Sequence, residues 1–278
     1  MQKIVFLGAG QMGQAALALL NEENYKLLAF GDNKVTGSIA GKKILPVTEA
    51  LNLQPNIVVL TVTGQEREAA LAAQVAASNF KGTVVKLSAW QRVLDIRKAV
   101  LQKLVPRLAV IPGAIAELGV YQGVFAACLN ELFSQRTLYL FDTFTGFTER
   151  DVVQEKTGNY SRAQTGDFSD TDEVTVLKKM PFPQQVRICK GYFPTTAQDL
   201  KATFALVSLD ADLYAPTLAG LSWFWPRLAP GGCLILHDWS SLRFKGVKKA
   251  FDVFEKKVGR IPLLPVGDLH GTALLMKA

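Results

Sequence analysis

The sequence runs through one pattern twice: short apolar runs rich in β-branched residues alternate with segments of helical spacing, and each series opens on a glycine loop. The first series starts at "KIVFLGAGQMG" and the second at "AIAELGVYQG". This alternation is typical of parallel sheets flanked by helices. We therefore predict an α/β chain with two Rossmann-like domains, residues 1–88 and 112–278, joined by a helical linker over residues 89–111.

The end of the second series distinguishes between two classes of α/β fold. After the apolar runs "AIAELG", "TLYLFD", "QVRICK", "FALVSLD" and "CLILHD", the last two runs, "RIPLLPV" and "GTALLMK", are separated only by "GDLHG". No helix fits between them, so we expect an antiparallel pair that closes the sheet. A parallel sheet with such a terminal hairpin is typical of a class I methyltransferase, whereas an ordinary dinucleotide fold continues with another helix and a parallel strand.

The composition excludes several classes of protein. Of the 278 residues 49% are hydrophobic, which supports full cores, but each apolar run ends in charge or glycine before it is long enough to span a membrane. The start "MQKIVFLGAG" goes directly into a strand and has no export signal. The three cysteines are isolated in apolar contexts. We expect a cytoplasmic protein with reduced thiols and no membrane partner.

The net charge of +7 raises the question of an anionic partner. The basic residues are scattered, and the clusters "KGVKK" and "FEKKVGR" fit solvated helix faces. Because no stripe of basic and aromatic residues is present, we expect no nucleic acid partner. A small molecule that carries phosphate is the more plausible ligand.

The first glycine loop, "GAGQMG", follows a strand and opens a helix, which lets backbone amides face a phosphate. Its glycines are Gly8, Gly10 and Gly13, and Asp32 ends the next strand, where it can bind ribose hydroxyls. The alternative is a fold that has lost its ligand. The segment "GDNKVTGSIAGKKILPVTEAL" resembles the small N-terminal domain of sugar acyltransferases, which implies a nucleotide or nucleotide-sugar pocket. Residues 1–88 hold no histidine, which weighs against an NAD(P)-dependent oxidoreductase.

The second glycine loop, "AELGVYQG", has an acidic residue before the turn. The donor S-adenosylmethionine has no pyrophosphate, and its methionine amino group is cationic, so Glu117 beside Gly119 and Gly123 suits it. Asp142 ends the next strand and suits the ribose hydroxyls. The alternative for Glu117 is a surface acid that faces a helix.

Acidic residues also end the two strands "FALVSLD" and "CLILHD". Asp210 and Asp212 follow the first, and His237 with Asp238 follow the second. Because the carboxyl ends of neighbouring parallel strands lie about 5 Å apart, we expect the four side chains to gather at one sheet edge. An aliphatic hydroxyl holds its proton with a pKa of about 16, so its methylation benefits from a divalent cation and a carboxylate base. The alternative is that these acids only cap turns, Asp212 as a helix N-cap.

A longer set of motifs carries a specific resemblance. The segments "IPGAIAELGVYQGVFAACLNELF", "LYLFDTFTGF", "GDFSDT", "KGYFPTT", "SLDADLYAPTLAGLSWFWPRLAPGG" and "HDWSS" resemble, in order and spacing, the macrocin and noviose O-methyltransferases. These are metal-dependent enzymes that methylate sugar hydroxyls. The resemblance implies that Asp210 is a metal ligand and Asp212 the base. The donor residues that it implies, together with the glycine loop, are Glu117, Gly119, Tyr121, Gly123, Asp142, Thr143, Asp167, Ser169 and Asp210.

This chain departs from the family at His237, where the family carries an acid. Magnesium prefers oxygen ligands, whereas imidazole suits manganese, iron or zinc. Three interpretations stay open: a metal that accepts nitrogen and is bound by Asp210, His237 and Asp238; magnesium held by the two aspartates with His237 behind them; or no metal and His237 as the base. We favour the second.

We predict an S-adenosylmethionine-dependent O-methyltransferase, assisted by a divalent metal, magnesium by preference, that acts on a small sugar-containing substrate. The alternative is a nucleotide-sugar-binding protein whose methyltransferase half is vestigial. Residues 148–169 form the longest irregular polar stretch and are the expected lid. The helix over residues 90–105 is a candidate interface for a homo-oligomer. His270 falls in the terminal hairpin, either at the pocket or on a surface turn.

Overall fold

The computed structural model describes residues 1–93 and 95–278. The chain divides into two compact units, which are described separately. The first consists of Met1–Asp95 with Gly267–Leu269, and the second of Ile96–Val266 with His270–Ala278.

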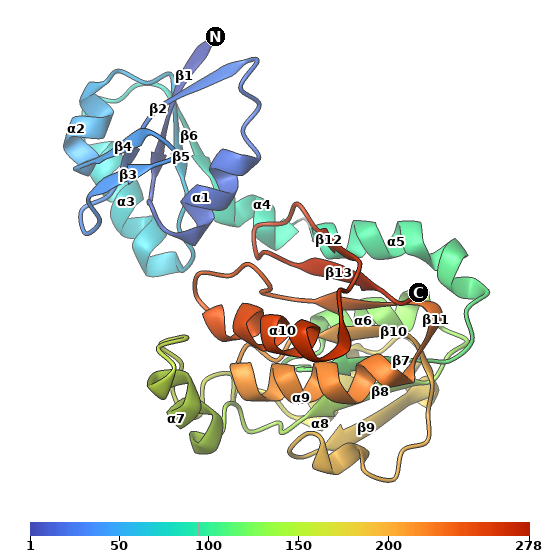
Figure 1. The fold of residues 1–278 in the computed structure, drawn as a ribbon. Coiled ribbons are helices and arrows are strands. Elements are labelled where there is room, and N and C mark those ends of the chain that lie inside the picture. The colour runs from blue at the N-terminus through green and yellow to red at the C-terminus, as the bar shows by residue number, and fades with distance from the viewer. Residues whose placement is uncertain (94) are drawn as a thin grey trace. The chain divides into compact units, whose positions relative to one another are not determined.

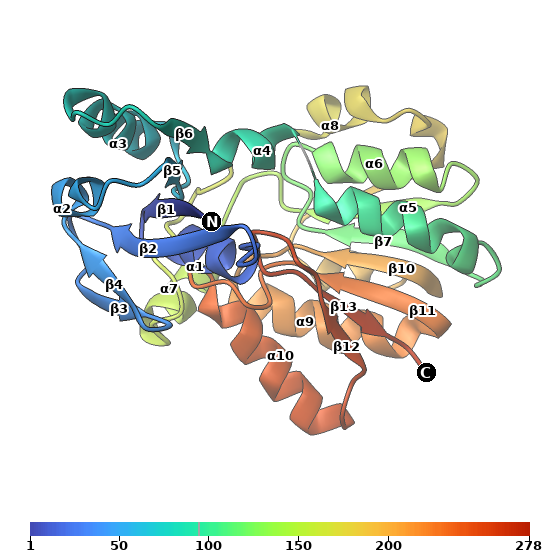
Figure 2. The same cartoon turned by 90° about the horizontal axis from the view of Figure 1, so that it is seen from above.

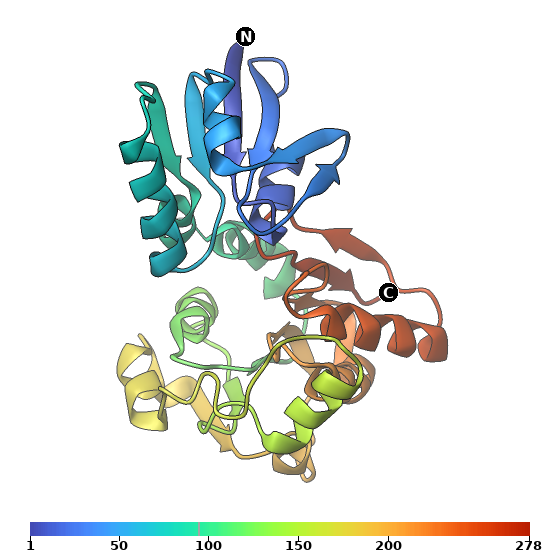
Figure 3. The same ribbon diagram turned by 90° about the vertical axis from the view of Figure 1, so that its left-hand side faces the viewer.

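The first unit is a sheet with helices on both faces (Figures 1 and 3). Its strands are β1 (Gln2–Leu7), β2 (Tyr25–Gly31), β3 (Gly37–Ile39), β4 (Lys42–Leu45), β5 (Ile57–Leu60) and β6 (Thr83–Lys86). Its helices are α1 (Gln11–Ala18), α2 (Val47–Asn52), α3 (Gln65–Ala77) and α4 (Leu87–Val93). The strand order is β3-β4-β2-β1-β5-β6, and neighbours run parallel except in the β3–β4 hairpin.

Alternation along the strands explains the two helical layers. Val5 and Leu7 of β1 pack in one core cluster with residues of α2 and α3, whereas Ile4 and Phe6 pack in a second cluster with Ala16 of α1. A parallel strand that is covered on both faces is apolar throughout, as "IVFL" is. The predicted Rossmann-like unit is confirmed as a fold.

The β3–β4 hairpin and α2 were not predicted. The hairpin turns at Ala40 and Gly41, which both have positive φ, as tight two-residue turns between antiparallel strands require. Its strands are too short for their alternation to stand out, and the charged "GKK" at the turn hides them further.

The second unit is built on a seven-stranded sheet (Figure 2). Its strands are β7 (Ala114–Leu118), β8 (Leu138–Asp142), β9 (Val186–Lys190), β10 (Phe204–Leu209), β11 (Leu228–Leu236), β12 (Leu263–Pro265) and β13 (Ala273–Met276). The order is β12-β13-β11-β10-β7-β8-β9. Strands β7 to β11 are parallel, and β13 runs antiparallel to both β11 and β12. The predicted class I methyltransferase sheet with its terminal hairpin is confirmed.

Helices cover both faces of this sheet. They are α5 (Ile96–Ala109), α6 (Val124–Leu132), α7 (Glu149–Thr157), α8 (Glu173–Lys179), α9 (Tyr214–Phe224) and α10 (Lys245–Val258), with the short 3-10 turns η1 (Pro183–Gln185), η2 (Thr195–Ala197) and η3 (Trp225–Arg227). Helices α5, α6 and α8 contribute to one core cluster, and α7, α9 and α10 to the other (Figure 2). Phe224 is fully buried in the second cluster among other aromatic rings.

The predicted linker differs from the structure. Instead of one helix over residues 89–105, α4 ends at Val93 and α5 begins at Ile96, and residue 94 lies outside the described residues. Leu101 and Leu108 of α5 are fully buried in the second unit, where α5 packs on α6. Helix α5 therefore belongs to that unit, because its apolar face is part of the core.

The predicted lid contains a regular helix, α7. Thr148 caps its start by accepting a hydrogen bond from the amide of Asp151. Its buried face consists of Val152 and two acids, Asp151 and Glu155, so the helix lacks the apolar periodicity that would reveal it in the sequence.

The strand order reverses at β7, whose two neighbours are β8 and β10. Open α/β sheets bind ligands at this point, outside the carboxyl ends of the strands. The second glycine loop follows β7, and Asp210 follows β10. Within the described residues, no helix is both long enough and apolar enough to cross a membrane.

Candidate active site

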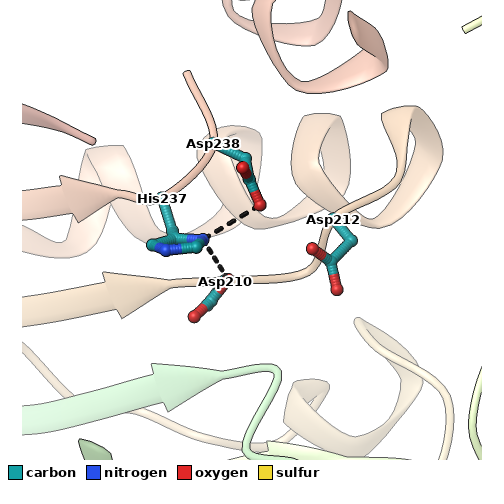
Figure 4. Close-up of side chains that lie close together, drawn as sticks. All are labelled: Asp210, Asp212, His237 and Asp238. Carbon is teal, nitrogen blue, oxygen red and sulfur yellow. Dashed lines mark hydrogen bonds and ion pairs between the residues drawn. The ribbon is translucent and has the colours of Figure 1, made fainter. Parts of the chain in front are cut away.

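Four side chains gather at the carboxyl ends of β10 and β11: Asp210, Asp212, His237 and Asp238 (Figure 4). Each offers one ligand atom, and these atoms all lie within 4.8 Å of one another. This convergence was predicted, because the carboxyl ends of β10 and β11, as parallel neighbours, lie side by side.

The backbone fixes both ends of this cluster. The amide of Asp210 donates to the Leu118 carbonyl at 2.8 Å, and that of His237 donates to the Leu209 carbonyl at 3.0 Å. The sheet pairing therefore continues one residue beyond each strand. Asp212 and Asp238 then adopt positive φ values of 56° and 55°, which aspartate tolerates better than most residues. The backbone turns sharply at both residues, which keeps their carboxylates near the sheet edge.

His237 is bonded to two of the acids. Its Nδ1 lies 2.7 Å from Oδ1 of Asp210 and 3.0 Å from Oδ2 of Asp238. Its Nε2 is buried and has no hydrogen-bond partner among the described residues. The imidazole is therefore oriented by the carboxylates of Asp210 and Asp238.

Electrostatics divide the acids into two kinds. Burial by itself would raise the pKa of Asp210, but the charge and hydrogen bond of His237, together with Arg97, lower that pKa to about 2. Burial raises the pKa of Asp212 well above its ordinary value, and the negative charges of Asp210 and Asp238 raise it further. Burial alone would lower the pKa of His237, but Asp210 and Asp238 raise it well above its ordinary value. Asp212 thus holds a proton more tightly than Asp210 does.

Sequence reasoning missed Arg97, on the first turn of α5. Its Nη1 lies 3.2 Å from Oδ2 of Asp210, and its guanidinium carbon lies 4.4 Å from the ring centroid of Phe125 on α6. Asp210 is therefore held by a cation on each oxygen, Arg97 on one and His237 on the other. An arginine in a charged helical stretch looks like a solvent-facing residue, so the sequence carries no signal for this contact.

Next to the cluster lies the glycine loop that follows β7. Glu117 is almost fully buried and pairs in register with Ser208 of β10, whose Oγ lies 3.3 Å from Oε1 of Glu117. Its Oε2 is buried without a partner among the described residues. Burial, and next the charge of Asp210, raise the pKa of Glu117. The surface alternative for Glu117 is wrong, because the residue is almost fully buried.

Gly119 is required by close backbone contact. Its φ is +87°, and a Cβ atom there would collide with the carbonyl oxygen of Asp210. Asp142 stabilises the same loop: its Oδ2 accepts the amides of Val120 at 2.7 Å and Tyr121 at 2.9 Å. The glycine loop and Asp142 are therefore held together by hydrogen bonds.

The remaining predicted donor residues lie in loops around the glycine loop and Asp142. Tyr121 donates its hydroxyl to Asp170 at 2.8 Å and packs edge-on against Phe168, while Gly123 is the left-handed N-cap of α6. Thr143 donates to the Gly146 carbonyl at 3.1 Å. The residue that caps α8 is Asp172, so Asp167 and Ser169 do not cap that helix. Asp167 instead accepts the amide of Gln164 at 2.9 Å, and the Ser169 amide donates to the Gly166 carbonyl.

Two further expectations concern single residues. The N-cap of α9 is Leu213, without a side-chain cap bond, so the capping alternative for Asp212 is wrong. The ring centroid of His270 lies 5.1 Å from that of His237, and its positive charge lowers the pKa of Asp210. His270 therefore lies at the cluster and not on an isolated surface turn.

In the first unit the predicted ligand residues also lie together. A Cβ atom on Gly13 would collide with the carbonyl oxygen of Gly8, whereas one on Gly10 would meet no atom within 4 Å. Asp32 accepts the amide of Ala9 at 3.0 Å. Gly13 is thus needed for packing, and Gly10 leaves open space beside the loop.

Known proteins resemble the second unit. The family model described as Macrocin-O-methyltransferase (TylF) matches residues 90–263. A mycinamicin III 3''-O-methyltransferase from Micromonospora griseorubida is 28% identical over 46% of this chain and 56% of its own length. An 8-demethyl-8-(2,3-dimethoxy-alpha-L-rhamnosyl)-tetracenomycin-C 4'-O-methyltransferase from Streptomyces olivaceus is 25% identical over 60% of this chain and 66% of its own length. The chain thus spans just over half of the first relative and just under two thirds of the second.

Two solved structures share the fold. The O-methyltransferase NovP matches 66% of this chain and 80% of its own, at 20% identity and a TM-score of 0.54. The calicheamicin methyltransferase CalS11 matches 77% of this chain and 94% of its own, at 21% identity and a TM-score of 0.54. Because the family model covers more than half of the sequence and includes the acidic cluster, this chain belongs to the macrocin-O-methyltransferase family.

Proposed function

We propose that this protein transfers the methyl group of S-adenosylmethionine to a hydroxyl group of a sugar-containing small molecule. The observation that carries the proposal is the cluster of Asp210, Asp212, His237 and Asp238 beside the glycine loop of β7. Membership of the family supports it, and both curated relatives are named as O-methyltransferases.

The donor would bind at the glycine loop. Oε2 of Glu117 is buried without a hydrogen-bond partner among the described residues, which is costly for a carboxylate oxygen, so it suits the cationic amino group of the donor. Asp142 would hold the ribose hydroxyls, since an ionised carboxylate accepts about four hydrogen bonds and three backbone amides occupy it. Tyr121 and Thr143 border the same space.

The donor set of the cluster fits a divalent cation. Three carboxylates and one imidazole nitrogen lie within 4.8 Å of one another, and carboxylate oxygens suit magnesium. We assign Asp210 and Asp238 as ligands, with His237 orienting both carboxylates through Nδ1. When bound, the cation would lower the pKa of the acceptor hydroxyl.

Asp212 would take the proton. Burial and its acidic neighbours raise its affinity for a proton, as a general base for a weakly acidic hydroxyl requires. The acceptor oxygen forms a bond to the methyl carbon while the bond from that carbon to sulfur breaks. The electron pair of the broken bond stays on sulfur, which becomes a neutral thioether, and the hydroxyl proton goes to Asp212.

The acceptor class follows from the relatives. The name of the Streptomyces olivaceus relative mentions a rhamnosyl group. We therefore propose a sugar hydroxyl, either on a glycosylated metabolite or on a nucleotide-linked sugar. A vestigial methyltransferase half is disfavoured, because the family's site residues, His237 apart, are present and converge.

For the first unit we propose a nucleotide ligand, supported by the open space at Gly10 and by Asp32 beside the loop. Replacement of Gly10 by alanine should leave the fold intact, because the added Cβ meets no protein atom, yet should block approach of a phosphate. Calorimetry with NAD, ATP and a nucleotide-sugar tests this idea. Equal binding by wild type and Gly10→Ala, or no binding by either, would contradict it.

The methyltransferase proposal is tested by comparing donor binding with methyl transfer. We expect wild type to bind S-adenosylmethionine at micromolar concentrations. Asp238→Ala should keep that binding, and both Asp210→Ala and Asp238→Ala should lose methyl transfer. Absence of binding by wild type at high micromolar donor would refute the proposal, and unchanged transfer by both variants would refute the metal assignment.

A further inference from the structure

Arg97 and Glu117 both interact with Asp210. Arg97 enters from α5, contacts Asp210 just beyond β10, and stacks on Phe125 near the start of α6. Glu117 lies one residue before the carboxyl end of β7 and pairs in register with Ser208 of β10. Asp210 links them, because its backbone amide bonds to Leu118, the residue after Glu117.

The two groups interact electrostatically. Burial raises the pKa of Glu117, the negative charge of Asp210 raises it further, and the positive charge of Arg97 lowers it. The side chain of Arg97 is only 16% exposed, so water screens this interaction weakly. A carboxyl group and a guanidinium are thus both held near Asp210, next to the glycine loop.

An amino-acid zwitterion has the complementary pattern of charges. The methionine part of the methyl donor carries an ammonium and a carboxylate on the same carbon. Oε2 of Glu117 has no partner among the described residues and suits the ammonium. The guanidinium has five donors in a planar fork, so it can hold a second carboxylate while it keeps Asp210.

We propose that Arg97 binds the carboxylate of the donor's amino-acid part, opposite Glu117, which binds its ammonium. This inference rests on the proposed function, because it assumes that S-adenosylmethionine is the donor. It gives helix α5 a role in donor recognition, beyond its packing on α6. Since Arg97 also contacts Asp210, donor binding and the acidic cluster would share one side chain.

The test is calorimetry with two probes, S-adenosylmethionine and its decarboxylated form, which keeps the ammonium and lacks the carboxylate. Wild type should bind the first at least about tenfold more tightly. Arg97→Gln should weaken binding of S-adenosylmethionine by about 10- to 100-fold, as loss of a charged hydrogen bond implies, and should change binding of the decarboxylated form by less than about threefold.

Two controls separate recognition from structure. Lys98→Gln removes a charge from the next residue, which forms an exposed ion pair with Glu131, and should bind both probes as wild type does. Arg97→Lys keeps the charge and should regain part of the discrimination. Equal loss for both probes in Arg97→Gln, or no loss for either, would overturn the role of Arg97. If wild type bound neither probe, both the role of Arg97 and the proposed function would be overturned.

Discussion

Nδ1 of His237 lies 2.7 Å from Oδ1 of Asp210. The same nitrogen is 3.0 Å from Oδ2 of Asp238, so the imidazole joins the two carboxylates that we propose as ligands of a cation. If the proposed cation site is correct, the residue at position 237 should affect how tightly the cation binds.

Replacement of His237 by aspartate should strengthen magnesium binding. The change removes a positive charge and adds an oxygen ligand of the kind that magnesium prefers. We expect His237→Asp to bind Mg²⁺ at least about tenfold more tightly than wild type by calorimetry, and His237→Asn, which adds no charge, to show a smaller gain. Equal affinity in wild type and His237→Asp would contradict an oxygen-based cation site.

Replacement of Asp212 by asparagine should slow the chemical step without weakening donor binding. A positioned general base typically contributes about 10²- to 10⁴-fold, so kcat should fall by a factor in that range. The donor's dissociation constant should stay within about threefold. Asp252→Asn is the control, because Asp252 pairs with Lys248 on the exposed side of α10. A wild-type kcat in Asp212→Asn would remove Asp212 from the mechanism.

The buried acid Glu155 should make stability depend on pH. Its Oε1 accepts the amide of Tyr214 at 2.6 Å, and burial, with a contribution from Asp151, raises its pKa against the hydrogen bonds from Tyr214 and Ser161. The folded state therefore holds the proton more tightly than the unfolded chain. The free energy of unfolding should fall as pH rises above the ordinary value of 4.5 toward the raised pKa.

Denaturant unfolding of Glu155→Gln measures this contribution, because glutamine keeps the acceptor oxygen and cannot ionise. Over that window of pH the variant should lose less stability than wild type. Glu149→Gln, which changes an exposed acid on the same helix, should follow wild type. If the free energy of unfolding changed with pH equally in wild type and Glu155→Gln, Glu155 would not be buried with a raised pKa.

Gly119 and Gly166 both have positive φ, so their replacement by alanine can be compared directly. A Cβ atom on Gly166 meets nothing within 4 Å, whereas one on Gly119 collides with the carbonyl oxygen of Asp210. Gly166→Ala should therefore cost only the backbone strain, about 1–2 kcal/mol. We expect Gly119→Ala to cost at least about 2 kcal/mol more and to weaken donor binding, as thermal unfolding and calorimetry would measure. Similar costs for both would refute the close contact at the switch point.

The extent to which the sequence predicts this molecule follows from what each segment buries. Strands β7, β8, β10 and β11 are covered on both faces, so they are recognisable as apolar runs, and the acids that end them mark the site. Helix α7 buries carboxylates instead of apolar side chains, so it resembles an irregular polar stretch. Tertiary contacts made by polar groups leave no periodicity to detect.

Arg97 illustrates the same limit at the site. The sequence contains 31 lysine and arginine residues, and nothing local separates the one that contacts Asp210 from those on solvated faces. The acids of the cluster were recognisable because each follows a strand, and the topology determines where strand ends meet. A helical residue that reaches the site from outside the sheet has no such marker.

The most direct test of the central claim is to incubate the protein with S-adenosylmethionine, Mg²⁺ and a panel of rhamnosides and nucleotide-linked deoxysugars, and to analyse the products by mass spectrometry. We predict at least one acceptor that gains a single methyl group on a sugar hydroxyl, with an equal amount of S-adenosylhomocysteine, and loss of both products in Asp212→Asn. Donor that binds but transfers no methyl group to any sugar of the panel would contradict the account.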